Sequence, residues 1–145
     1  HDELRRQRQM CIRDSFKGLV YQWEFGYGLS YSNFEYSELR LNKKSYTQYD
    51  TLKIEVTVTN DSKIEGSEVV QVFCSDLVAS VTPSVKRLRG FEKIKLKPNE
   101  SKRATLNIPV KELAFVGVDN KWIVESGKFK LSISNLQSEF SVVGK

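Results

Sequence analysis

The run LKIEVTVT at residues 52–59 alternates apolar and polar side chains without a break. Successive side chains of a β-strand point to opposite faces, so a period of two gives this segment one apolar face and one polar face. The apolar face consists of Leu52, Ile54, Val56 and Val58. The run therefore predicts a strand that covers a core on one side only.

Short β-prone runs separated by turn residues follow one another from residue 33 onward. Residues 68–74, EVVQVFC, are apolar on nearly both faces and suit a central strand. Residues 93–97 and 104–108 alternate again, and Pro98-Asn99 supplies a turn between them. The chain thus continues in strands and turns beyond its clearest strand.

The last third of the chain extends this pattern. An apolar run at 113–118 precedes a predicted turn at Asp119-Asn120, and residues 122–124 with 129–133 should form the final pairings. Seven or more short strands result, and no helical stripe of useful length competes with them. We therefore predict an all-β fold, an immunoglobulin-like or fibronectin type III-like sandwich of two antiparallel sheets.

The length of 145 residues and a hydrophobic content of 39% fit one globular domain. Residues 1–15 are polar and arginine-rich and match no strand pattern, so we expect a non-native or disordered leader there, or else a genuine frayed terminus or short helix. We predict that residues 16–32 form a linker segment with the motif FGYGLSY and that residues 33–145 form the sandwich.

Charge and composition argue against several function classes. The net charge of +5 is spread thinly, whereas nucleic-acid binding needs a concentrated patch or a motif. No stretch approaches the roughly 18 apolar residues of a membrane-spanning helix. The single histidine is His1, and the two cysteines, Cys11 and Cys74, give no disulfide framework. We expect no metal, no cofactor, no nucleic acid and no membrane partner.

Several motifs have two readings, and the plainer one is favoured. Gly26-x-Gly28 lacks the third glycine, the preceding strand and the helix start of a dinucleotide-binding loop. Five acids fall in turns or beside strand ends without a shared predicted pocket, which favours solvated surface groups over a catalytic pair. They are Glu65, Glu68, Asp76, Asp119 and Glu125.

A basic run could bind a polyanion, but its alternation favours a solvated strand face whose lysines discourage edge-to-edge pairing. Its members are Lys86, Arg87, Arg89, Lys93, Lys95 and Lys97. Trp23 and Trp122 could stack on sugar rings, although burial is the default for tryptophan. Asn60-Asp61-Ser62 and Asn99-Glu100-Ser101 are glycosylation sequons in predicted turns.

Ordered blocks of sequence carry a family resemblance. The motif FGYGLSY at 25–31 is followed by VTVTN at 56–60, EGSEVVQVF at 65–73, KRLRGFEKIKLKPNES at 86–101 and ESGKFKLSIS at 125–134. This series resembles the C-terminal fibronectin type III-like domain of glycoside hydrolase family 3, the β-glucosidases and β-xylosidases, over about residues 24–143. Val81-Thr82-Pro83 departs from the family, which often has an Arg-Pro pair there.

The resemblance implies a non-catalytic accessory domain. In the family, the aspartate nucleophile lies in an N-terminal barrel and the acid/base carboxylate usually in the α/β domain after it, both upstream of the first matching residue. No residue is therefore expected to be catalytic. The expected partners are the catalytic domains of the parent enzyme, which the domain would stabilise, and Phe25, Tyr27 and Tyr31 would contact them.

Two further expectations follow from the resemblance. The parent enzyme would be periplasmic or secreted, with any signal peptide outside this sequence. The alternatives to an accessory domain are a stand-alone carbohydrate-binding module that recruits polysaccharide, which needs a row of exposed aromatic residues on one sheet face, and an adhesive β-sandwich.

Overall fold

The computed structural model describes residues 28–77, 86–116 and 121–144. Contacts divide the chain into two units, His1–Ser30 and Tyr31–Lys145, and the regular elements of the described residues lie in the second unit. In chain order these are β1 (Phe34–Leu41), β2 (Ser45–Tyr46), β3 (Thr51–Asn60), β4 (Gly66–Asp76), β5 (Arg87–Leu96), β6 (Ser101–Pro109), the 3₁₀ turn η1 (Val110–Leu113), β7 (Phe115–Val116), β8 (Trp122–Ile123), β9 (Gly127–Ile133) and β10 (Leu136–Val142).

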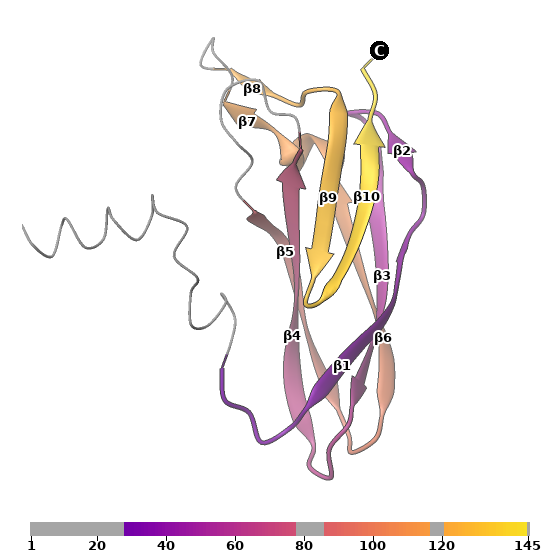
Figure 1. Ribbon diagram of the computed structural model, residues 1–145, viewed down its shortest axis with the longest axis vertical. Coiled ribbons are helices and arrows are strands. Elements are labelled where there is room, and N and C mark those ends of the chain that lie inside the picture. Colours follow the sequence, from indigo (N-terminus) through magenta and orange to yellow (C-terminus); the bar gives the residue numbers. More distant parts are fainter. Residues whose placement is uncertain (1–27, 78–85, 117–120, 145) are drawn as a thin grey trace, which may run out of the picture. The chain divides into compact units, whose positions relative to one another are not determined.

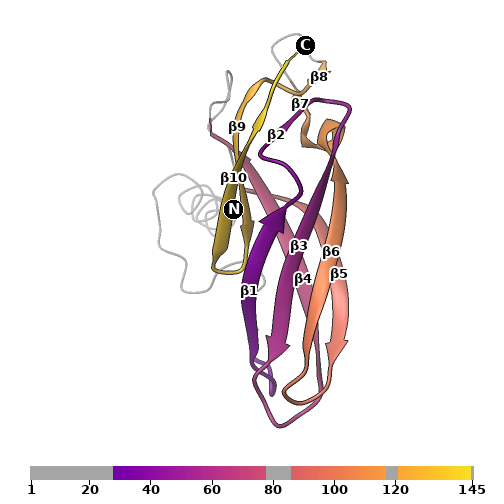
Figure 2. The ribbon, with the colours of Figure 1, turned by 90° about the vertical axis from the view of Figure 1, so that its right-hand side faces the viewer.

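Two sheets form the body of this unit, as Figures 1 and 2 show. The smaller sheet has the order β1-β3-β6, and the larger has the order β2-β10-β9-β4-β5. A short ribbon, β7-β8, is separate from both. All strand pairs are antiparallel except β2 with β10, which is parallel. The predicted fold class, a two-sheet β-sandwich, is confirmed.

The alternating runs supply the core between the sheets. Leu52, Ile54, Val56 and Val58 of β3 are fully buried, while their polar neighbours face outward or are half-buried. In β6 the alternation places Ala104, Leu106 and Ile108 inward. Because β3 and β6 pair along their whole length, these two apolar faces form one continuous surface.

Strand β4 has the central position predicted for it, between β9 and β5. Val70, Val72 and Cys74 face the core. Burial raises the pKa of the Cys74 thiol to about 12, so the group is a neutral, apolar core member at ordinary pH. Strand β5 ends the sheet order, and its lysines Lys93 and Lys95 are exposed, as an edge strand requires.

Two local features differ from the sequence-based expectation. Asn60 is the last residue of β3 rather than part of a turn. Strand β9 pairs with β10 and β4, whereas β8 pairs with β7 rather than with β9. The predicted turn at 119–120 lies outside the described residues. Within the described part of the chain, η1 is the only helical element, and no helix there is long and apolar enough to span a membrane.

Candidate interaction surface

The residues predicted to contact a parent enzyme are only partly visible. Tyr31 is 94% exposed, in the segment that leads into β1. Phe25 and Tyr27 lie outside the described residues, as do Gly26 and Trp23. The side chain of Trp122 is likewise not described. A contact role for Phe25, Tyr27 and Tyr31 stays a prediction.

The acidic residues occupy separate positions and have structural partners. Glu65 forms an ion pair with Lys95, with 2.7 Å between Oε1 and Nζ. Glu68 on β4 accepts a hydrogen bond of 2.7 Å from the hydroxyl of Tyr36 on β1, which joins the two sheets. Burial and the bond to Glu68 raise the pKa of Tyr36, so this donor keeps its proton.

The other acids belong to different elements. Asp76 ends β4 and Glu125 precedes β9, both half-buried, and Asp119 is outside the described residues. Among the residues that the structure describes, no group of three histidine, cysteine or carboxylate side chains has the arrangement of a metal site.

Asn60, the first residue of a glycosylation sequon, is fully buried. Its amide nitrogen donates to the backbone oxygens of Ile64, Leu96 and Lys97 at 2.8, 3.3 and 3.2 Å. The hydroxyl of Ser62 donates to its Oδ1 at 2.5 Å. The amide nitrogen that would carry a sugar is thus enclosed, and the folded domain cannot be glycosylated there.

The basic run does not form one face, because a β-bulge interrupts β5. Val72 pairs with Gly90, and Phe73 pairs with Leu88, which leaves Arg89 as the extra residue. Arg89 is half-buried, and its Nη1 donates to the backbone oxygen of Glu112 in η1 at 2.7 Å. The prediction of a single solvated face is therefore wrong for Arg89.

The same bulge collects apolar side chains on the outer face of the larger sheet. We call Val69 and Phe73 of β4 with Leu88 and Phe91 of β5 the outer apolar patch. Leu88 lies opposite Phe73. Phe91 lies opposite Gln71, the next residue of β4 on the same face. Phe91 is 69% exposed, Leu88 41% and Val69 40%. Three exposed apolar side chains thus lie beside the half-buried Phe73.

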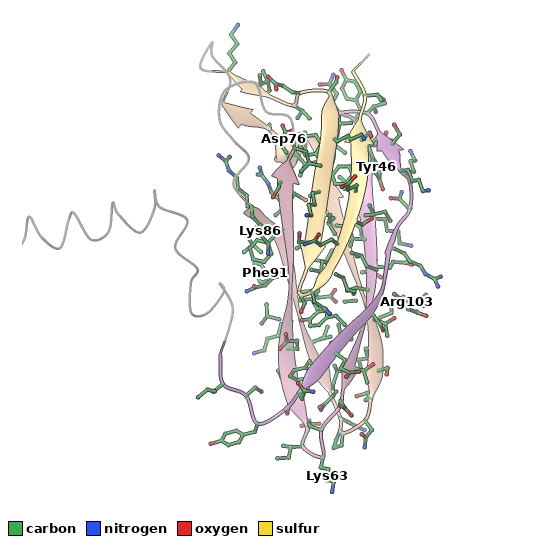
Figure 3. All side chains as sticks on the ribbon, in the orientation of Figure 1. Tyr46, Lys63, Asp76, Lys86, Phe91 and Arg103 are labelled. Carbon is green, nitrogen blue, oxygen red and sulfur yellow. The ribbon has the colours of Figure 1, made fainter. Side chains whose placement is uncertain are left out.

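A cationic rim borders this patch. The Nζ of Lys86 lies 4.8 Å from the centre of the Phe73 ring, within the range of a cation–π contact. Lys93, opposite Val69, and Lys95 are exposed on the same side of β5. Figure 3 labels Phe91 and Lys86 on the β5 side of the sheet.

The patch suits contact with another protein surface better than contact with sugar. Of its two phenylalanines only Phe91 is mostly exposed, while Phe73 is half-buried, so the face lacks the row of exposed aromatic rings on which a sugar chain would stack. Sequence reasoning missed the patch, because strict alternation places Leu88 and Phe91 on opposite faces. The only local signal was Gly90, since a glycine within a strand often marks a bulge.

Comparisons with known proteins agree with this architecture. The family model described as the fibronectin type III-like domain matches residues 68–137. Thermostable β-glucosidase B of Acetivibrio thermocellus is 38% identical over 118 residues, which cover 81% of this chain and 16% of that protein. A β-xylosidase of Formosa agariphila is 40% identical over 109 residues, which cover 75% of this chain and 15% of that protein.

Solved structures show the same relation. A β-glucosidase of Listeria innocua in complex with gluconolactone matches with a TM-score of 0.77 and 30% identity, covering 88% of this chain and 20% of that one. β-Glucosidase 3B of Thermotoga neapolitana in complex with α-D-glucose matches with a TM-score of 0.74 and 34% identity. The match covers 86% of this chain and 18% of that one. Fold and sequence define the chain as a fibronectin type III-like domain. It belongs to the C-terminal fibronectin type III-like domains of glycoside hydrolase family 3.

Proposed function

We propose that this chain is a non-catalytic accessory domain that packs on the catalytic domains of a β-glucosidase-type or β-xylosidase-type enzyme and stabilises them. One observation supports this most directly. The matched residues fold as one complete sandwich, yet they span only about a sixth of the curated relatives' length. Most of each relative therefore lies outside the region that this chain represents.

The carboxylates support a structural role. A retaining glycosidase needs two carboxyl groups about 5 Å apart, one of which has a raised pKa. Glu65 and Glu68 are instead held by Lys95 and Tyr36. The carboxyl groups of Asp50 and Glu100 have lowered pKa values. The largest cause is a hydrogen bond from a backbone amide, that of Thr47 for Asp50 and that of Lys97 for Glu100. That direction is opposite to the one a general acid requires.

The proposed domain boundaries are consistent with this function. Residues 33–145 form the sandwich, and residues 16–32 form a linker whose Phe25, Tyr27 and Tyr31 contact the catalytic body. Aromatic residues are enriched in protein interfaces, which supports such a contact.

An activity assay tests the proposal. The purified chain should release no more nitrophenol from an aryl β-glucoside than a heat-killed sample does, whereas the intact Acetivibrio thermocellus relative serves as the positive control. Turnover by the purified chain that persists through repurification and disappears on heating would contradict the assignment.

A further inference from the structure

We propose that the outer apolar patch is the surface on which the catalytic body of the same enzyme docks, and that the docked surface is apolar with an acidic border. The inference rests on the proposed function and deepens it, because it assigns the contact to one face of one sheet. The patch consists of Val69, Phe73, Leu88 and Phe91.

Exposure sets this face apart from the rest of the larger sheet. The inner face of β4 and β5 contributes Val70, Val72 and Leu96, all fully buried, to the core. The outer face of the same two strands leaves Phe91 69% exposed and Leu88 41% exposed. A contiguous exposed apolar patch with polar surroundings is typical of an interaction site.

The bulge at Arg89 gives this patch its composition. In an unbroken register Phe73 would lie opposite Arg89, and Leu88 would turn toward the core beside Cys74. The extra residue changes the position of both side chains. Leu88 lies opposite Phe73 on the outer face, and Arg89 donates to the backbone oxygen of Glu112. A charged group is thereby removed from the centre of the surface, and interface centres are depleted in charge.

The rim indicates the charge of the partner. Lys86, Lys93 and Lys95 border the patch, and Glu65, which bonds to Lys95, is exposed beside them. A surface with acidic residues opposite Lys86 and Lys93 would be complementary, since interfaces pair potentials of opposite sign. A second copy of this chain would place lysines opposite lysines, and a glucan would find only one mostly exposed aromatic ring on which to stack.

The length of the relatives identifies the occupant. About five sixths of each matched enzyme lies outside the region that this chain covers. That remainder is tethered to the domain, so its effective concentration at the patch is high and a patch of modest size suffices for a stable contact.

Heat inactivation of a chimera tests the assignment. Residues 28–144 of this chain would replace the corresponding region of thermostable β-glucosidase B, with the enzyme truncated before that region as the reference. The chimera should keep glucosidase activity on heating at least threefold longer than the truncated enzyme. Phe91→Ser with Leu88→Ser should remove most of that gain, while Ile64→Ser, a control at another exposed apolar site (54%), should retain it.

Two further measurements separate folding from docking. Thermal unfolding of the isolated chain should occur at the same midpoint for the native sequence and for Phe91→Ser, because the ring is mostly exposed. Hydroxyl-radical labelling of Phe91 should fall at least fivefold in the chimera relative to the isolated chain, with labelling of Ile64 unchanged.

The outcomes are distinguishable. If the chimera is no more stable than the truncated enzyme, both the proposed function and this assignment fail. If the chimera is stabilised but Phe91 is labelled as in the isolated chain and the substitutions have no effect, only the docking face is wrong. Protection of Phe91 that rises with the concentration of the isolated chain, or on addition of soluble glucan, would overturn it in favour of self-association or sugar binding.

Discussion

The side chain of Asn60 bonds to two backbone segments at one end of the sandwich. Its amide bonds to oxygens in the loop after β3 and at the end of β5, in a site closed to water. Loss of a donor to a buried acceptor costs more than an ordinary hydrogen bond contributes, and the bond to the Leu96 oxygen is buried. The asparagine of this glycosylation sequon therefore has a structural role in the fold.

The substitution Asn60→Ala should lower the free energy of unfolding by about 2–3 kcal/mol, because it removes a fully buried amide that donates to three backbone oxygens. Urea denaturation measures the change. Asn107→Ala, at an exposed position of β6, is the matched control and should change stability by less than about 0.5 kcal/mol. Equal effects of the two substitutions would show that the Asn60 network does not stabilise the domain.

Asp50 gives stability a specific pH dependence. The backbone amide of Thr47 at 2.7 Å, the Lys43 ammonium at 3.0 Å and the Thr47 hydroxyl lower its pKa from 3.8 to about 2. Because the folded-state pKa lies below the unfolded one, this contribution is complete above about pH 4 and is lost as the pH falls toward 2.

The native chain should therefore lose more stability between pH 4 and pH 2 than Asp50→Asn does. Urea midpoints measured at several pH values in this window give the comparison. Asp61→Asn, at an exposed carboxyl in the next loop, should leave the slope close to that of the native chain. A native-like slope for Asp50→Asn would exclude this carboxyl as the source.

At the level of elements, the β9–β10 hairpin has an unfavourable turn residue. Ile133 pairs with Leu136, so Ser134 and Asn135 form a two-residue turn. Ser134 has a φ of 50°, whereas Asn135 is not among the residues with positive φ. A positive φ at the first central position only is the pattern of a type II′ turn, which prefers glycine there.

Ser134→Gly should raise the free energy of unfolding by about 0.5–1 kcal/mol, since glycine adopts this conformation without the steric cost that serine has. Ser138→Gly, within β10, makes the same change of composition and should instead lower stability by about 0.5–1 kcal/mol. Thermal unfolding of the two variants side by side measures the opposite signs. A loss of stability in Ser134→Gly would contradict the turn assignment.

Elements also show what the sequence could predict. The strands β3, β4 and β6 were predictable because their apolar residues repeat at period two or fill both faces. In β10 the inward face reads Leu136, Ser138, Phe140 and Val142, and the serine hides the strand signal. The patch depends on one extra residue at Arg89, and alternation alone places Leu88 on the wrong face. Register is decided by pairing with a partner strand, which a single segment does not encode.

At the scale of the whole molecule, the sandwich separates two roles between its surfaces. Nearly all the large apolar side chains of β3 and β6 fill the space between the sheets, which stabilises the unit by itself. The outer face of β4 and β5 carries exposed apolar residues that do not contribute to this core. Family membership could be read from ordered sequence blocks, whereas the docking face could be located only from strand pairing.

The parallel pair of β2 and β10 has a mechanical consequence. The start of β1 and the end of β10 lie at opposite ends of the sandwich (Figure 1). Bonds of 2.9 Å from Ser141 N to Lys44 O and 2.8 Å from Val143 N to Tyr46 O cross between the two strands. Tension applied along the chain would slide these strands past each other and load both bonds at once, so they must rupture together. A pulling force between the ends of the sandwich would therefore meet this sheared pair in addition to the pairing of β1 with β3.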